Sequence, residues 1–338
     1  MFRRSLHLSA MFLAVACVFN VGSPAVADIT DKPLEASNGT SEVGAYLDFQ
    51  IPALQFAQRG ERRKRRSGSR KKKTDAGSAV TDHEHCTECE KLEGFVLPSD
   101  ISDEIRLMVG KAKGNMNKVV GIQVARGGIE TGLEADFIND GACMEIDSEK
   151  WAIDYSGKRP WKAIHKGVDI PQPNGTPIRA IASGTVVGKF LNEGNRKGIE
   201  VMIRHRPEQT GLAYWTYSQY THLREMSPLG IGERVKLGQE IGKTSNTGKM
   251  GRRIRRDALH LAIIYSERPE WSNDGGFVIP KDAYWMDPNA FYRPSGPYDS
   301  QSLAALPEDQ KKVSTPYMKH DGSFVPTETK RIWPYPCE

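Results

Sequence analysis

The chain has 338 residues, enough for one large domain or two small ones, and a formal net charge of +5 at pH 7. This charge is not spread evenly, because ten Lys and Arg residues against one acid fall between positions 59 and 73. Subtracting the +9 of this run leaves −4 for the remainder, so the basic character belongs to one segment. After the first 27 residues no stretch is apolar enough to cross a bilayer, which excludes a membrane-spanning mature protein.

Residues 1–27 have the pattern of an export signal peptide. Two arginines near the start precede a mostly apolar run from 6 to 21, and Ala25-Val26-Ala27 fits a small-x-small cleavage site. We expect cleavage after Ala27 and an exported mature protein in the periplasm or the extracellular cell envelope. An alternative is lipidation at Cys17, although the residue three before it is Ala14 rather than the usual leucine.

Residues 28–80 are predicted to form a disordered arm that ends in a basic linker. The run 59–73 contains no apolar residue with which to build a core, so a solvated linker is one interpretation. The other is an electrostatic tether to an anionic envelope surface. Nucleic acid is not an expected partner, because an exported protein rarely meets it.

Residues 81–150 are predicted to be a small α+β lead-in subdomain. It includes an expected helix over about 100–113, for which Ser99 or Ser102 would be the N-cap.

Four cysteines remain after the signal is removed, namely Cys86, Cys89, Cys143 and Cys337. An even number in an oxidising compartment predicts disulfides, and three pairings are open. Because His83 and His85 lie beside Cys86 and Cys89, a metal clip is an alternative for that pair. A redox-active pair is a third interpretation.

From about residue 161 the chain is rich in short β-forming runs separated by turn residues. Runs of roughly four to six residues recur at 167–170, 178–182, 184–187, 199–203, 213–217, 233–235, 239–242 and 259–264. This spacing is typical of antiparallel all-β domains. We therefore predict a mainly β fold, an antiparallel sheet or sandwich over 151–295. An irregular tail over 296–338 is expected to follow, held at its end by Cys337.

His165, Asp169 and His260 are the candidate metal ligands. His165 and Asp169 are four residues apart in the sequence HKGVD, where Gly167 leaves room between them, and His260 lies in a later predicted strand. Two imidazole nitrogens and one carboxylate oxygen form a three-ligand zinc set, which leaves a fourth position for water in catalytic sites. A single histidine in a strand is more often a structural residue, so the surrounding motifs decide between the two interpretations.

Those motifs resemble the lysostaphin and LytM-type zinc metallopeptidases, which are peptidoglycan endopeptidases. HKGVDIPQPNGTPIRAIASGTVV is similar to the family's opening His-x-Gly-x-Asp motif and the strands after it. Tyr220-Thr221-His222-Leu223 is similar to its Tyr-x-His-Leu, and GERVKLGQEIGKTSNTG to its Gly-Gln-x-Ile-Gly hairpin. Leu259-His260-Leu261 stands at the closing His-x-His motif, and Met286-Asp287-Pro288 at a common ending. The resemblance runs in consistent order over about 161–292.

The resemblance implies a β-sheet peptidase domain with Zn²⁺ held by His165, Asp169 and His260, and peptidoglycan cross-links as the substrate. It assigns His222 a catalytic role beside the zinc-bound water. One departure stands out, because the first histidine of the closing motif is replaced by Ala258, and an acidic residue that often follows is replaced by Ala262. His205 is a candidate substitute base.

The loop before the closing motif carries four arginines, and two interpretations of it are open. The arginines could pair with free carboxylates of the wall peptides, or they could simply be solvated. They are Arg252, Arg253, Arg255 and Arg256.

Two functions therefore compete on sequence grounds. One is an active endopeptidase that cuts wall peptides, which the complete ligand set favours. The other is a catalytically weakened domain that binds the wall or activates a separate wall hydrolase, which Ala258 favours.

Overall fold

The computed structural model describes residues 86–109, 116–143, 164–192, 197–249 and 256–338, all of which belong to one compact unit. The predicted signal peptide, arm and basic run lie outside the described residues. Within the described ranges, no helix combines the length and the apolar character needed to cross a bilayer.

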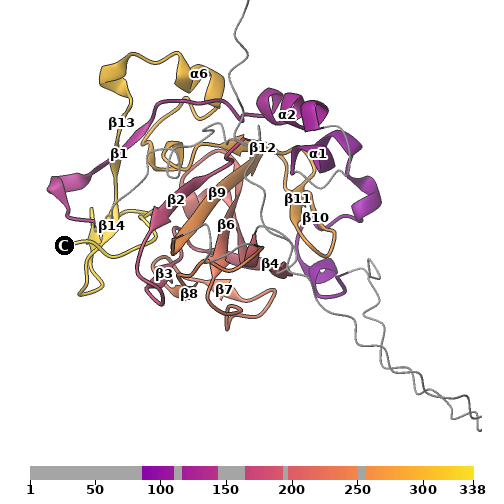
Figure 1. Cartoon of the computed structure of the whole chain (residues 1–338), viewed down its shortest axis with the longest axis horizontal. Helices are drawn as coiled ribbons and strands as arrows, with labels where there is room; N and C mark the ends of the chain where they lie inside the picture. The colour runs from indigo at the N-terminus through magenta and orange to yellow at the C-terminus, as the bar shows by residue number, and fades with distance from the viewer. Residues whose placement is uncertain (1–85, 110–115, 144–163, 193–196, 250–255) are drawn as a thin grey trace, which may run out of the picture. The chain divides into compact units, whose positions relative to one another are not determined.

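A seven-stranded antiparallel sheet forms the centre of the fold (Figure 1). Its strands follow the order β12-β9-β6-β5-β4-β7, and β2 pairs with β9 beside this path. The strands are β2 (Val168–Pro171), β4 (Gly184–Asn192), β5 (Gly198–His205), β6 (Trp215–Leu223), β7 (Arg234–Val235), β9 (Ala258–Ser266) and β12 (Tyr284–Met286). The predicted mainly β, antiparallel fold is confirmed.

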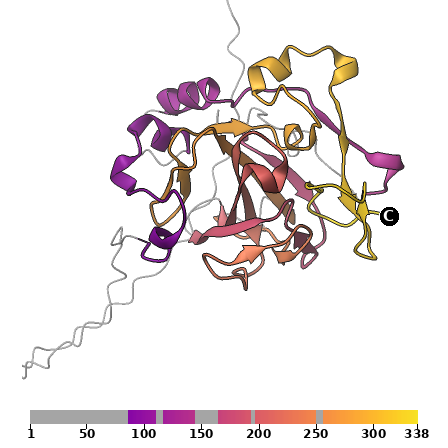
Figure 2. The same cartoon turned by 180° about the vertical axis from the view of Figure 1, so that it is seen from behind.

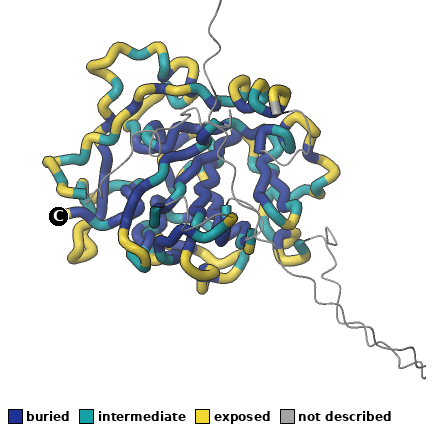
Figure 3. Tube along the Cα trace, viewed as in Figure 1, coloured by how far each residue is buried: buried dark blue, intermediate teal, exposed yellow. Residues whose placement is uncertain are grey.

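The central strands are buried over most of their length, as the dark blue trace in Figure 3 shows. Every residue of β5 is buried. Such a strand reads as a nearly continuous apolar run in the sequence because both of its faces are covered. Its polar members Glu200, Arg204 and His205 must therefore find partners inside the protein.

Smaller sheets surround the central one. Strand β3 (Pro177–Arg179) pairs with β8 (Glu240–Lys243), and β10 (Trp271–Asn273) pairs with β11 (Val278–Pro280), both antiparallel. A one-turn helix, α4 (Pro207–Thr210), connects β5 to β6 and ends at Gly211, whose φ of +74° suits glycine.

The lead-in residues add two helices and a strand, namely α1 (Asp103–Met108), α2 (Met116–Ala125) and β1 (Glu134–Phe137). Ser102 caps α1, since its side chain accepts a hydrogen bond from the Ile105 N–H at 3.4 Å. Ile105 and Met108 are fully buried in the same core as the strands of the central sheet. Short 3₁₀ turns lie at Cys89–Lys91, Pro98–Asp100, Ile138–Asp140, Ala290–Tyr292 and Glu308–Gln310.

The tail contains short regular elements where the sequence predicted irregular chain. These are α6 (Ser300–Ala304), β13 (Lys312–Thr315), β14 (Tyr317–Met318) and β15 (Phe324–Val325). Strand β13 pairs in parallel with β1, so the yellow C-terminal segment lies beside the magenta lead-in strand in both views (Figures 1 and 2). The sequence pattern missed β13 because its partner β1 lies far away along the chain, and it missed β14 and β15 because each is only two residues long.

The four described cysteines form two disulfides, Cys86–Cys89 and Cys143–Cys337. The disulfide expectation is met, and the metal-clip interpretation of Cys86 and Cys89 is wrong, because their sulfurs are bonded to each other. Cys143–Cys337 spans a sequence separation of 194 residues, whereas Cys86–Cys89 spans 3. In the chain-entropy account a longer closed loop restricts the unfolded chain more strongly.

Removing Cys143–Cys337 is therefore expected to lower the free energy of unfolding by about 2–5 kcal/mol, and removing Cys86–Cys89 by less than about 2 kcal/mol. Urea denaturation of the Cys143→Ala/Cys337→Ala and Cys86→Ala/Cys89→Ala double variants tests this order. Equal losses in the two variants would contradict it.

Candidate metal centre

Asp169 and His260 lie directly opposite each other on neighbouring strands. In the antiparallel pair of β2 and β9, Asp169 is the register partner of His260. Opposite residues of an antiparallel pair project from the same face of the sheet. The Oδ1 atom of Asp169 is 2.8 Å from Nδ1 of His260, and both side chains are less than one-fifth exposed.

His165 completes the group from the turn just before β2. Its Nε2 atom lies 3.1 Å from Asp169 Oδ1 and 3.0 Å from His260 Nδ1, and its side chain is buried. Gly167 makes this approach possible, because a Cβ atom there would lie 2.3 Å from the Leu261 carbonyl oxygen and 2.9 Å from Cε1 of His260. A side chain at 167 would push the turn away from the sheet.

The three converging atoms suit a divalent metal ion. Metal bonds of about 2.0–2.2 Å place neighbouring atoms of a tetrahedral shell about 3.3–3.6 Å apart, a little wider than the observed separations of 2.8–3.1 Å. Burial raises the pKa of the Asp169 carboxyl, but the charges and hydrogen bonds of His165 and His260 lower it more strongly. The net pKa is well below the ordinary value, so the carboxylate stays ionised. Within the described residues this is the one His/Cys/Asp/Glu group with metal-binding geometry.

His222 reaches the same area through a β-bulge. Glu200 pairs with Thr221 and Ile199 with Leu223, so His222 is an extra residue in β6, with a φ of +69°. A bulge reorients a side chain, and a left-handed backbone in a residue other than glycine is strained. The bulge leaves the His222 ring centroid 6.1 Å from that of His260.

Two carbonyl oxygens set the tautomer of His222. Its Nδ1 lies 2.8 Å from the Lys197 oxygen and 3.1 Å from the Thr247 oxygen. Because carbonyl oxygens only accept hydrogen bonds, Nδ1 carries the proton, and the lone pair of the neutral ring is on Nε2. The Lys197 oxygen also accepts the His222 backbone N–H at 3.2 Å, which fixes the ring and its backbone together.

A buried carboxylate lies on the same face of the sheet. Glu200, Thr221, His260 and Asp169 are successive register partners across β5, β6, β9 and β2. Glu200 is fully buried, accepts a hydrogen bond from Gln219 Nε2 at 2.7 Å and lies 3.5 Å from Lys197 Nζ. This ion pair anchors the residue whose carbonyl holds His222. Glu200 was not predicted from the sequence, because an acid inside a β-forming run has no motif of its own.

Lys166, which lies between His165 and Gly167 in the opening motif, was also missed. Burial and the charge of Lys197 lower its pKa to about 7, and its Nζ lies 5.0 Å from the Trp285 ring centroid. Its position inside the HKGVD motif is the sequence feature that could have identified Lys166.

His205 is not a substitute base. It is fully buried, with Nδ1 2.8 Å from the Ser183 carbonyl oxygen and Nε2 2.7 Å from Ser218 Oγ. Nδ1 donates to the carbonyl and Nε2 accepts from the hydroxyl, so both nitrogens are engaged in the core. Burial lowers the pKa of His205 to about 4, although the bond to Ser183 opposes this.

This buried histidine predicts a pH dependence of stability. Between about pH 6.5 and pH 4 the unfolded chain binds a proton at His205 and the folded chain does not. The free energy of unfolding should therefore fall as the pH is lowered across this window, by up to about 3 kcal/mol from this residue. In His205→Gln, which cannot titrate, denaturation midpoints measured from pH 7 to pH 4 should fall less steeply. Parallel curves for the two proteins would contradict the assignment.

Ala258 begins β9, two residues before His260, and is buried. Its N–H donates to the Ser245 carbonyl oxygen at 3.1 Å, and its register partner is Pro171. Alternation along the strand therefore places 258, 260 and 262 on one face. Of the four loop arginines, Arg252, Arg253 and Arg255 lie outside the described residues, and Arg256 is half-buried beside the start of β9.

Residues 163–270 match the sequence model of peptidase family M23. The chain is 34% identical over 107 residues to the peptidoglycan DD-endopeptidase ShyA of Vibrio cholerae, covering 32% of this chain and 22% of that protein. It is 39% identical over 87 residues to ShyC of the same organism, another peptidoglycan DD-endopeptidase, covering 25% and 18%. The chain thus spans about a fifth of the length of these curated relatives.

Among solved structures, the catalytic domain of lysostaphin from Staphylococcus simulans aligns with a TM-score of 0.25 and 26% identity. That alignment covers 30% of this chain and 68% of that domain.

An antiparallel sheet that carries a His/Asp/His group with metal-binding geometry defines a candidate metalloprotein. The family match is more specific, and residues 163–270 are a peptidase family M23 domain. The resemblance inferred from the sequence motifs is confirmed.

Proposed function

We propose that this protein is an exported zinc metalloendopeptidase that hydrolyses the peptide cross-links of bacterial peptidoglycan. The convergence of His165, Asp169 and His260 within 3.1 Å of one another is the observation that carries the proposal. The relatives named as peptidoglycan DD-endopeptidases support the substrate class. The site would act in the periplasm or the extracellular cell envelope.

The residues of the site would have different roles in hydrolysis. A zinc ion bound by the three ligands supplies Lewis acidity, which lowers the pKa of a bound water and polarises a carbonyl. His222, held as the Nδ1–H tautomer by two carbonyls, would use Nε2 to accept a proton or to orient the water. In its protonated form the same nitrogen could donate to the developing oxyanion.

The proposed binding of the substrate depends on charge. Wall peptides carry free carboxylates, and guanidinium groups bind carboxylates through paired hydrogen bonds. Arg252, Arg253, Arg255 and Arg256, which precede β9 in the sequence, would supply such contacts.

Digestion of purified peptidoglycan tests the proposal. The full chain loaded with one equivalent of zinc is expected to release soluble peptide fragments, and a chelator that strips the zinc is expected to stop the release. Restoration by added Zn²⁺ is the control for damage by the chelator. Fragment release that continues after the metal has been removed, as measured by metal analysis, would exclude the zinc mechanism.

The second candidate is a catalytically weakened domain that binds the wall or activates a separate wall hydrolase. Ala258 favours it, because a general base typically contributes about 10²–10⁴-fold and one candidate base is missing. Binding of the zinc-loaded chain to intact peptidoglycan without any fragment release would support this candidate.

The basic run 59–73, which lies outside the described residues, is proposed to tether the protein to an anionic envelope surface. Deleting it should weaken binding to isolated envelopes, and binding of the intact protein should fall as salt is raised. Exposed charges are screened over about 8–10 Å near physiological ionic strength. Sedimentation with envelopes at low and high salt measures both effects, and equal binding with and without the run would leave it a plain linker.

A further inference from the structure

The Cys86–Cys89 disulfide links two residues of a single turn and joins no separate elements. Its chain segment is held on the core from the other side, because Val96 and Gly94 exchange backbone hydrogen bonds with Trp271 at 2.8 and 2.9 Å. The Trp271 indole N–H also donates to the Glu93 carbonyl oxygen at 3.0 Å. Opening the disulfide would therefore leave this anchor and the core intact.

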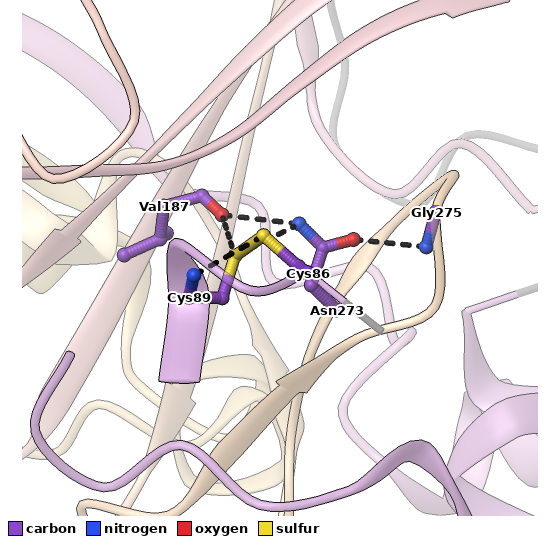
Figure 4. Close-up of a disulfide and its surroundings, with 5 residues drawn as sticks. All are labelled: Cys86, Cys89, Val187, Asn273 and Gly275. Atoms are coloured by element: carbon purple, nitrogen blue, oxygen red, sulfur yellow. Dashed lines mark hydrogen bonds between the residues drawn. A yellow bond between two sulfur atoms is a disulfide. The ribbon is translucent and has the colours of Figure 1, made fainter. Parts of the chain in front are cut away.

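The two sulfurs differ in their surroundings. Cys89 is fully buried and Cys86 is only partly buried, so an external thiolate can approach Cys86 more readily. The backbone N–H of Cys89 points at the Cys86 sulfur with an N–S distance of 3.2 Å. Asn273 Nδ2 lies 3.7 Å from the Cys89 sulfur (Figure 4). Each sulfur thus has an N–H group that would stabilise it as a thiolate.

The surroundings also suit the reduced form. Val187 is an extra residue in β4, because Val186 pairs with Ile203 and Gly188 with Met202. The carbonyl oxygen of this bulged residue lies 3.8 Å from the Cys89 sulfur and accepts from Asn273 Nδ2 at 3.2 Å. A Cys89 thiol could donate its S–H to the same oxygen, so the pocket offers a partner to either protonation state.

The other disulfide also joins a partly buried cysteine to a buried one, but its backbone setting and its N–H contacts differ. Cys143–Cys337 is bracketed by two backbone hydrogen bonds of 3.1 Å between Ala142 and Glu338, which keep the two chain segments together. No N–H group is directed at either of its sulfurs within the described residues. The surroundings of Cys143–Cys337 are therefore those of a structural crosslink.

We propose that Cys86–Cys89 is a thiol–disulfide exchange site, opened by a protein dithiol that attacks Cys86. The partner thiolate bonds to the Cys86 sulfur as the S–S bond breaks, and the electron pair leaves on the Cys89 sulfur. The partner's second thiolate then attacks its own half of the mixed disulfide and releases Cys86. The partner ends as a disulfide, and its two protons pass to Cys86 and Cys89. The sulfurs exchange two electrons in all.

A dithiol is required by the proximity of the two cysteines. After a monothiol has attacked Cys86, the Cys89 thiolate, three residues away, can attack the mixed disulfide and expel the monothiol. A dithiol escapes this reversal by resolving the mixed disulfide with its own second sulfur.

The test uses dithiothreitol as the dithiol and glutathione as the monothiol, on the full oxidised chain without denaturant. Free thiols are alkylated after timed intervals and assigned by peptide mass. Dithiothreitol is expected to open Cys86–Cys89 at least about 10-fold faster than Cys143–Cys337, with an unchanged circular dichroism spectrum. Glutathione at equal thiol concentration is expected to leave most Cys86–Cys89 closed.

Two sets of variants test the chemistry. Asn273→Asp keeps the side-chain shape but removes the N–H donor, and it should slow opening by about threefold or more, as expected for a leaving thiol whose pKa has risen by about one unit. Asn117→Asp, which adds the same charge at an exposed position of α2, should leave the rate unchanged. With glutathione disulfide, Cys89→Ser should form an adduct at Cys86, whereas Cys86→Ser should react far more slowly at buried Cys89.

If both disulfides open at the same rate, or if Cys86–Cys89 opens only as the chain unfolds, the bond is structural and the proposal is wrong. Equal adduct formation in the two serine variants would also overturn the assignment of Cys86 as the attacked sulfur. These measurements do not depend on wall cleavage, so they stand apart from the proposed function.

Discussion

Replacing Asp169 by alanine is expected to remove stoichiometric zinc and to reduce wall cleavage by at least about 10³-fold, equivalent to a loss of about 4 kcal/mol of transition-state stabilisation. Asp169 supplies the one anionic ligand of the group, and its Oδ1 lies within 3.1 Å of both histidine nitrogens. Without Asp169, only two imidazoles would remain to bind the ion, one from a turn and one from a strand. Metal analysis after dialysis and release of soluble fragments from peptidoglycan measure the two effects.

A matched control is Asp136→Ala, which removes an exposed carboxylate from β1 and should change neither quantity. His260→Ala and His165→Ala should resemble Asp169→Ala in both measurements. The assignment fails if Asp169→Ala keeps one zinc per chain. If zinc is lost but cleavage persists, the three residues bind a metal that the reaction does not need.

The arrangement of His165 and Asp169 was predictable from the sequence because it is set by local rules. The spacing in HKGVD and the glycine between these two candidate ligands indicated a tight turn before a strand, and the structure places His165 and Asp169 in that arrangement. The alternation of side chains along the later predicted strand indicated on which face of that strand His260 lies. The strand pairing that makes Asp169 and His260 direct neighbours depends on residues 91 positions apart, which a motif match supplied and residue patterns alone could not.

The surroundings of the metal centre were not predictable in the same way. The bulge that turns His222 towards His260 is a two-against-one register between β5 and β6, and no local pattern marks its position. Glu200 was not singled out within its β-forming run, and only its pairing across the sheet shows that it lies in line with Thr221 and His260. His205 was a candidate substitute base on sequence grounds, whereas the Ser183 carbonyl and the Ser218 hydroxyl occupy both of its nitrogens in the structure.

The strands of the tail show the same limit. Strand β13 consists of four residues and pairs with β1, which lies more than 170 positions earlier in the chain. Short strands of this kind derive little of their stability from local propensity, because side-chain packing and burial decide whether they form. The sequence could indicate that Cys337 holds the end of the chain, but not that the segment before it forms a sheet with the lead-in.

Ala258→His is expected to raise the rate of wall cleavage if the protein is an active peptidase whose rate is reduced by the missing histidine. Residue 258 lies on the face of β9 that also presents His260, opposite Pro171 and beside the backbone of Ser245. A histidine there would add a second nitrogen base near the site where His222 already lies, and a general base typically contributes about 10²–10⁴-fold. The measurement is fragment release from purified peptidoglycan by zinc-loaded wild type and variant at equal concentration.

The gain must come from the imidazole rather than from added bulk, so Ala258→Leu, of similar size, is the matched control and should show no gain. In the Ala258→His background, His222→Ala is expected to cancel much of the gain, because the two bases would act on the same water. A wild type that already reaches full activity with His222 alone should be unchanged by Ala258→His or slowed by crowding. Absence of cleavage in wild type and in Ala258→His, with zinc bound in both, would instead favour the wall-binding or regulatory candidate.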